Sequence, residues 1–212
     1  MVRVKICGVT TPAEAVFAAE CGAAAVGLNF YPKSPRFVSD ERAEAIVREL
    51  SPFTAAVGVF VGTPDVLTMD AAQQFGLRGV QTYSTKPPDF DFFPAAHVPA
   101  FRVKGQECLD AIRSYVATAR AVGRPPAAVL VDSHVPGEFG GTGHRAPWEI
   151  LAGFDPGVPL ILAGGLTPDN VAEAIRTVRP YAVDVASGVE SAPGRKDPDL
   201  VRRFIDNARA AG

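Results

Sequence analysis

Residues 2–22, VRVKICGVTTPAEAVFAAECG, contain a complete strand–helix unit. The short apolar run VRVKIC (2–7) is typical of a buried strand. Thr11 and Glu14 form a capping-box pattern with Pro12 at the first helical position, and Gly22 supplies a glycine stop. The stretch therefore predicts a strand over 2–7 and a helix between Thr11 and Gly22.

The same alternation recurs along the chain. Most of the further apolar runs are continuous rather than alternating, as expected of parallel strands covered by helices. They lie at residues 24–30, 54–61, 78–82, 98–103, 127–132, 158–163 and 181–186. Helical patterns open at Ser39, at the Thr-Pro-Asp sequences of Thr63 and Thr167, near residue 106 and at residue 197. The fourth connection, STKPPDFDFFPAAH (84–97), contains three prolines and predicts an irregular segment in place of a full helix.

Eight strand–helix units predict a single-domain α/β structure over residues 1–212, a (β/α)₈ or TIM barrel with an irregular fourth helical unit. The competing architecture is an open, doubly wound sheet. That fold usually has fewer strands and a G-x-G-x-x-G fingerprint after the first one, and CGVTTPAE does not match it. The barrel is therefore the better prediction.

Composition excludes several classes of function. The 212 residues are 47% hydrophobic, which is enough for one core, and the net charge of −2 comes without a basic run that would suggest nucleic acid. No apolar run of about 18 residues predicts a membrane span, and the N-terminus lacks the pattern of a signal peptide. Cys7, Cys21 and Cys108 lack C-x-x-C spacing, which argues against a disulfide framework or a zinc site and favours a reducing cytoplasm.

The histidines carry no metal-binding pattern either. We expect His97 to lie on the surface, and we assign His134 and His144 to a loop with at most an accessory role. That loop, residues 133–147, is long, polar and glycine-rich, which favours a lid over the site.

Active sites of such barrels lie at the carboxyl ends of the strands. Five candidate residues follow or end strands there: Cys7, Arg36, Gln81, Tyr83 and Asp132. Cys7 is either a small apolar residue packed in the core or a reactive thiol at the end of the strand. Arg36 is either a solvated charge or a side chain that binds a carboxylate through two parallel hydrogen bonds. Asp132 either caps the strand or points into the site, since carboxylates are seldom buried without a partner.

Two glycine-rich turns follow the last two strands. AGG (163–165) and SGV (187–189) have small residues whose backbone N–H groups can approach an anion closely. Either turn alone is well explained as a tight connection. Together they favour a phosphate site formed by Gly164, Gly165, Ser187 and Gly188.

Many of these stretches, in order, resemble the phosphoribosylanthranilate isomerase family: VKICGVT, FYPKSPR, GVFV, GVQ, LVDS, FGGTG, AGGLTPDNV and VRPYAVDVASGVE. The similarity runs from residue 2 to about residue 205. It implies an enzyme of tryptophan biosynthesis that performs an Amadori rearrangement. The aminoaldose N-(5′-phosphoribosyl)anthranilate would become the corresponding 1-amino-1-deoxyketose, without cofactor or metal.

The resemblance also implies roles for individual residues. Cys7 falls on the general base, Asp132 on the general acid, Arg36 on the group that binds the anthranilate carboxylate, and Asp184 on a possible sugar contact. From the residues alone, packing or hydrogen bonding explains Asp184 at least as well. Because the base must be a thiolate, we expect positive charge to hold or lower the pKa of Cys7. Lys5 has the same strand parity, which suggests that it faces the same interior.

Some positions depart from the family pattern. VQTYS replaces VQLHG after the fourth strand, so Tyr83 stands where the family has histidine, and Asn29 lies within the second strand. Two alternatives therefore stay open: a related phosphosugar enzyme of altered specificity and a non-catalytic phosphate-binding barrel. Retention of Cys7 and Asp132 argues against the non-catalytic alternative. The sequence allows both a monomer and a homodimer.

Overall fold

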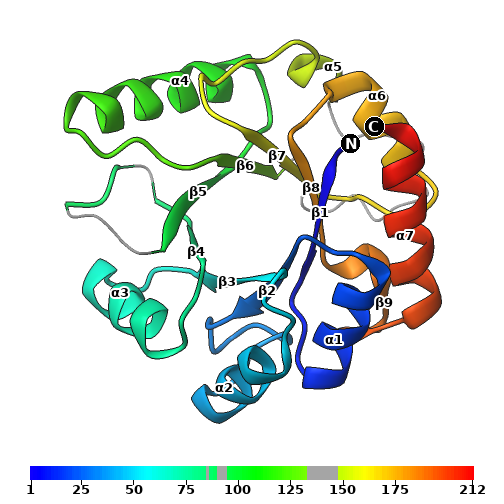
Figure 1. Ribbon diagram of the computed structural model, residues 1–212. Helices are drawn as coiled ribbons and strands as arrows, with labels where there is room; N and C mark the ends of the chain where they lie inside the picture. Colours follow the sequence, from blue (N-terminus) through cyan, green and yellow to red (C-terminus); the bar gives the residue numbers. More distant parts are fainter. Residues whose placement is uncertain (85, 90–94, 133–147) are drawn as a thin grey trace.

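The computed structural model describes residues 1–84, 86–89, 95–132 and 148–212, so the expected lid at 133–147 lies outside the described residues. Eight parallel strands close into a barrel, each pairing with its neighbours in chain order and β8 pairing with β1 (Figure 1). Every expected strand is confirmed to within two residues. The strands are Arg3–Cys7 (β1), Ala25–Asn29 (β2), Ala55–Phe60 (β3), Gly79–Thr82 (β4), Ala96–Arg102 (β5), Val129–Asp132 (β6), Leu160–Ala163 (β7) and Ala182–Val185 (β8).

Helices surround the barrel. In the described part of the chain they are Pro12–Cys21 (α1), Asp40–Glu49 (α2), Asp65–Gln74 (α3), Gln106–Ala121 (α4), Trp148–Leu151 (α5), Val171–Val178 (α6) and Pro198–Ala211 (α7). Between β4 and β5 the described residues, 83–84, 86–89 and 95, include no helix, as the prolines predict. After β8 come a 3₁₀ turn, Ser187–Val189, and a small hairpin made of Glu190–Ala192 (β9) and Arg195–Lys196 (β10).

The helix ends agree only partly with the expected caps. Thr11 caps α1 by accepting the N–H of Glu14 at 3.3 Å, and Gly22 ends the helix with a φ of 98°. The capping box is incomplete. The Glu14 carboxylate accepts the N–H of Thr10 (2.7 Å) and of Lys196 (2.8 Å), and not the N–H of the cap residue Thr11. This carboxylate therefore ties the start of α1 to β10.

Both helices predicted from the Thr-Pro-Asp sequences are present, but they begin two and four residues after Thr63 and Thr167. The third helix begins at Asp65 after Pro64, which has no side-chain cap bond. The sixth begins after Asn170, whose side chain accepts the N–H of Thr167 and donates to the carbonyl of Gly165. These two bonds stabilise a turn over 167–170 and delay the helix.

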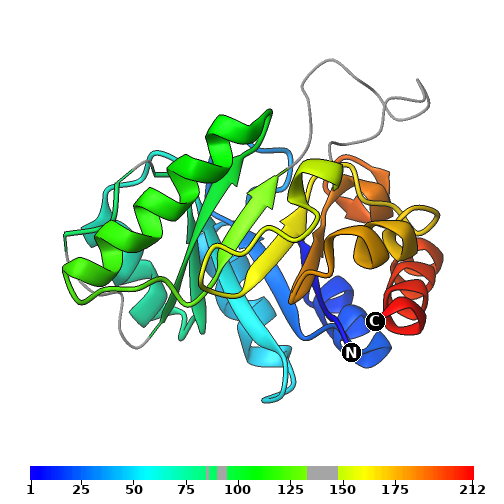
Figure 2. The ribbon, with the colours of Figure 1, turned by 90° about the horizontal axis from the view of Figure 1, so that it is seen from above.

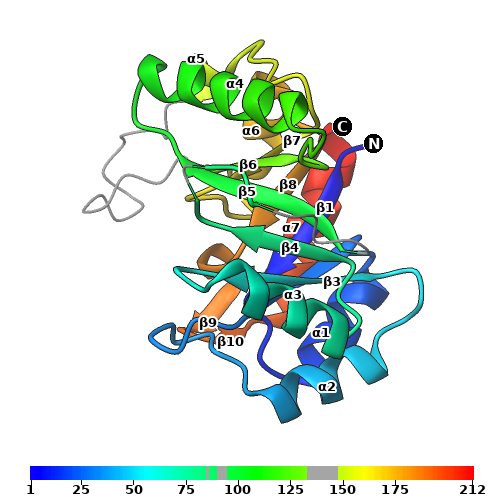
Figure 3. The same ribbon diagram turned by 90° about the vertical axis from the view of Figure 1, so that its left-hand side faces the viewer.

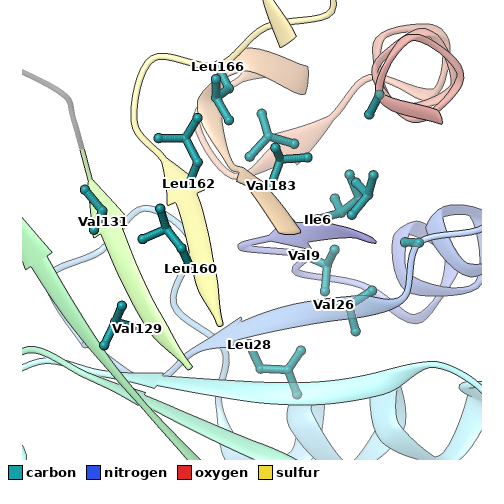
Figure 4. Packing of buried hydrophobic residues seen from close by; sticks show 14 of the residues in the cluster. Ile6, Val9, Val26, Leu28, Val129, Val131, Leu160, Leu162, Leu166 and Val183 are labelled. Carbon is teal, nitrogen blue, oxygen red and sulfur yellow. The ribbon is translucent and has the colours of Figure 1, made fainter. Parts of the chain in front are cut away.

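Strand alternation divides the buried residues into two groups. Even-numbered residues of β1 and β2, such as Ile6 and Leu28, face the helices and belong to the large outer core. Figure 4 shows part of this core along β1, β2, β6, β7 and β8. A smaller inner cluster fills one side of the barrel with Ala100, Leu130 and Ala163. Burying each large aliphatic or aromatic side chain of the outer core contributes roughly 1.5–3 kcal/mol.

The C-terminal helix completes the outer layer beside the N-terminus. Phe204 and Ile205 of α7 are fully buried. Figure 2 shows the two chain ends side by side, and the last residue, Gly212, lies against the backbone of Val2. Because β1 pairs with β8, this helix covers the seam at which the barrel closes.

The expectation that His97 lies on the surface was wrong. The ring is half-buried, and its Nε2 lies 2.9 Å from Thr82 Oγ1 on the neighbouring strand. Strand pairing explains this contact, since His97 is opposite Val80, two residues before Thr82. Burial lowers the pKa of His97 from 6.5 to about 4.

The lowered pKa of His97 predicts a pH-dependent contribution to stability. The folded protein favours the neutral ring, so this contribution is complete above about pH 6.5 and is lost as the pH falls toward 4. We expect His97→Gln to reduce the acid-induced loss in free energy of unfolding by about 1–2 kcal/mol, less than the full shift implies because the ring is partly exposed. Urea unfolding of both proteins across pH 4–8 measures this. If the free energy of unfolding changes with pH equally in the two proteins, the contribution of His97 is contradicted.

Candidate active site

The loops after β1, β2 and β8 meet at the carboxyl end of the barrel. Figure 3 shows β9 and β10 at this end, beyond the strands. Asn29 shapes the second loop: its Oδ1 accepts the N–H of Tyr31 at 2.9 Å, and its Nδ2 donates to Ser34 Oγ at 3.2 Å. Ser34 Oγ also accepts the N–H of Arg36. Asn29, which departs from the family pattern in the second strand, thus stabilises the turn that carries Arg36.

Arg36 is held by an acidic partner that sequence reasoning missed. Its Nε and Nη2 each donate to Glu190 at 2.7 Å, one bond to each carboxylate oxygen. Hydrogen bonding to Glu190 raises the pKa of Arg36, so the guanidinium stays charged. Lys196 Nζ donates to the same carboxylate at 2.9 Å and to the carbonyl of Ala186 at 3.0 Å. Burial alone would raise the pKa of Glu190, but the bonds from Arg36 and Lys196 lower it.

Glycines allow this group of loops to pack closely. Gly194 has a φ of 80°, and a Cβ there would overlap the carbonyl oxygen of Pro35. The hydroxyl of Thr10 donates to the Gly194 carbonyl at 2.9 Å. Gly8 has a φ of 72°, and a Cβ there would overlap the Cδ of Arg36. The hairpin, the Arg36 loop and the loop after β1 therefore form one packed unit.

A polar network occupies the barrel interior. Lys5 Nζ donates to Asp184 Oδ1 at 2.9 Å and to Gln81 Oε1 at 3.0 Å, and all three residues are buried. The inward orientation of Lys5 is confirmed. Burial, the largest single effect, would lower the pKa of Lys5, but the charges and hydrogen bonds of Asp184 and Cys7 together raise it, so the ammonium is retained. Asp184 is thus a hydrogen-bond anchor, and its contact to a sugar stays a prediction.

Cys7 ends β1 on the same inward face as Lys5 and is 8% exposed. The expectation that positive charge holds or lowers the pKa of Cys7 was wrong. Burial and the Asp184 carboxylate raise the pKa of Cys7, and the opposing charges of Lys5 and Lys196 do not compensate. These surroundings therefore favour the neutral thiol.

Tyr83 lies close enough to Cys7 and Asp132 to respond to the charge of both. Its ring packs on the inner apolar cluster, and its hydroxyl accepts a 3.4 Å bond from Gln81 Nε2. Burial, followed by the negative charges of Cys7, Asp132 and Asp184, raises the pKa of Tyr83 to about 12. Asp132 ends β6 on the inward face, opposite Ala163 of β7. Both Cys7 and Asp132 therefore border the interior that Tyr83 occupies.

The two glycine-rich turns pack directly against each other. Gly164 and Gly165 have φ values of 89° and 64°, which favour glycine. Gly188 lies so close to the carbonyl of Leu166 that a Cβ would overlap its oxygen. Ser187 and Gly188 begin the 3₁₀ turn after β8. The turns expected to bind phosphate are thus adjacent at the carboxyl end of the barrel.

Two features are absent from residues 1–84, 86–89, 95–132 and 148–212. No cluster of three or more histidine, cysteine, aspartate or glutamate residues there could hold a metal ion. No helix within these residues is both long and apolar enough to cross a membrane.

Comparisons with known proteins agree with this geometry. The family model described as N-(5'phosphoribosyl)anthranilate (PRA) isomerase matches residues 4–207. An N-(5'-phosphoribosyl)anthranilate isomerase from Geobacter sulfurreducens is 48% identical over 210 residues, 99% of both chains. One from Myxococcus xanthus is 44% identical over 99% of this chain and 97% of its own.

Solved structures give the same result. Phosphoribosyl anthranilate isomerase from Thermotoga maritima superposes with a TM-score of 0.84 at 38% identity, over 99% of this chain and all of that one. A phosphoribosyl anthranilate isomerase in complex with reduced 1-(o-carboxyphenylamino)-1-deoxyribulose 5-phosphate has a TM-score of 0.81 at 36% identity, with the same coverage. The chain therefore belongs to the N-(5′-phosphoribosyl)anthranilate isomerase family.

Proposed function

We propose that Cys7 and Asp132 are the general base and the general acid with which this isomerase rearranges N-(5′-phosphoribosyl)anthranilate. The observation that carries the proposal is their placement: both end strands on the inward face and border the interior occupied by Tyr83. The adjacent turns at Gly164 and Gly188 lie at the same end of the barrel. Family membership supports the isomerase over a barrel of altered specificity or one without catalytic activity.

The chemistry needs one proton donor and one proton acceptor. Asp132 donates a proton to the ring oxygen as the C1–O bond breaks, which opens the furanose to a protonated Schiff base. The Cys7 thiolate then removes the proton on carbon 2, and the electron pair moves to give an enolamine. Tautomerisation of the enolamine yields the aminoketose, so no net oxidation occurs.

Binding at both ends of the substrate would orient the sugar between these groups. The Nε and Nη2 of Arg36 bind Glu190, so we assign the anthranilate carboxylate to Nη1. Gly164, Gly165, Ser187 and Gly188 would bind the phosphate through backbone N–H groups. The ligand in the solved complex carries a carboxyphenyl group and a 5-phosphate, so the site of that relative accommodates both kinds of group.

The interior residues would complete the site. Gln81, Tyr83 and Asp184 would contact the sugar, with the Tyr83 hydroxyl serving where the family pattern has a histidine nitrogen. The proposed unit is a single barrel domain over 1–212 acting in the cytoplasm, where Cys7 stays reduced. It would act as a monomer or a homodimer, since the T. maritima relative is dimeric and has also been obtained as monomers.

Removing either catalytic group should abolish or greatly reduce turnover. We expect Cys7→Ser and Asp132→Asn each to lower kcat by about 10²-fold or more, because each removes one proton-transfer partner. The assay generates phosphoribosylanthranilate in situ and follows the loss of its fluorescence. Cys21→Ser, on the outer helix α1, serves as the control and should retain activity. Near-wild-type turnover of either site variant would refute the assigned roles.

Separating the two glycine turns should weaken phosphate binding. In Gly188→Ala the new methyl group would overlap the Leu166 carbonyl and push the turns apart. We expect KM to rise about 10-fold, equivalent to about 1.4 kcal/mol, and inhibition by inorganic phosphate to weaken in parallel. Gly123→Ala, at the far end of α4, controls for lost stability: its φ of 74° makes alanine strained, but nothing lies within 4 Å. Equal KM values in both variants would argue against phosphate at these turns.

A further inference from the structure

Lys5 is a buried cation to which the proposed proton transfers assign no role. It is 6% exposed, and its ammonium donates to Asp184 and Gln81 inside the barrel. Burying an ion pair costs free energy because both ions lose their hydration, and an apolar pair of similar volume would avoid that cost. The pair is thus poorly explained by stability alone, and its surroundings indicate another role.

Lys5 and Cys7 occupy the same small space beside β2. They are two residues apart on β1, so both side chains point inward. Cys7 is opposite Gly27, and a Cβ built on Gly27 would lie 2.7 Å from Cys7 Sγ and 3.2 Å from Lys5 Cε. The absence of a side chain at Gly27 therefore provides the space in which the lysine stem and the sulfur lie together.

We infer that Lys5 is a positioning residue for the reaction: held by Asp184 and Gln81, its ammonium stabilises the thiolate of Cys7 when the base loses its proton. This inference rests on the proposed role of Cys7. Coulomb attraction in a buried site is much stronger than in water, so a fixed charge beside Sγ has a large effect. Gln81 contributes a neutral contact that fixes the ammonium without cancelling its charge.

Other charged groups also act on Cys7. Lys196 of β10 favours the thiolate, but less strongly than Lys5, and it is bound to Glu190 of β9. Arg36 is bound to the same carboxylate, which offsets part of both charges. On β8, Asp184 opposes the thiolate directly while it holds Lys5. Tyr83, after β4, has a pKa far above neutrality and contributes a neutral hydroxyl.

These opposing effects of Lys5 and Asp184 provide a specific signature. Removing the ammonium in Lys5→Met should leave the thiol harder to ionise. Removing the opposing carboxylate in Asp184→Asn should make it easier to ionise, because Cys7 becomes the remaining anionic partner of Lys5. A purely structural role of the pair would predict the same loss of order from either change.

The test is the pH dependence of Cys7 alkylation by iodoacetamide, read by mass spectrometry of the Cys7 peptide. We expect the profile of Lys5→Met to move to higher pH by at least about one unit, so that alkylation at a given pH below the transition slows about 10-fold. Asp184→Asn should move it to lower pH, and Lys5→Arg, which keeps the charge, should stay nearer to wild type. The Cys21 peptide of each sample is the internal control.

Opposite shifts of the two variants support the inference. An unmoved profile in Lys5→Met, or shifts of both variants in one direction, overturns it. If circular dichroism shows that Lys5→Met does not fold, Asp184→Asn decides, and a profile that fails to move to lower pH overturns the inference. The proposed function is judged separately: full turnover of wild-type protein alkylated at Cys7 would refute the base, whatever the profiles show.

Discussion

The ion pair between Lys5 and Asp184 joins the first and last strands at the seam where the barrel closes. The two residues are register partners of β1 and β8, and their 2.9 Å contact lies inside the barrel. Closure therefore brings together charges that are 179 positions apart in the chain. Gln81 extends the network to β4 on the other side of β2 and β3. The position of the proposed base and its electrostatic environment both depend on this link.

A second set of polar contacts arranges the rim of the barrel. Glu190 binds Arg36 and Lys196, and the Glu14 carboxylate joins α1 to the same hairpin. These residues come from the segments after β1, β2 and β8, which are neighbours because the barrel is closed. The hairpin thus orients a cation toward the site while balancing much of the charge that would otherwise be buried.

The apolar and polar parts of the structure have different consequences. The outer core supplies most of the stabilisation, since its large side chains are almost entirely removed from water. In the interior, Ala100, Leu130 and Ala163 of β5, β6 and β7 form an apolar cluster, whereas Lys5, Gln81 and Asp184 of β1, β4 and β8 form a polar network. A protein stabilised by its outer layer can hold charged groups inside the barrel, where the low dielectric strengthens their effect on a reacting proton.

The sequence by itself determined the eight strands, most of the helices, the inward parity of Lys5 and Cys7, and the candidates at the strand ends. These follow from local periodicity, glycine and proline positions, and the rule that parallel strands share one carboxyl end. Only the tertiary structure decided that Glu190 holds Arg36, that His97 is partly buried, and that burial raises the pKa of Cys7. Those properties arise from burial and from charges distant in the chain, and neither is encoded in a local pattern.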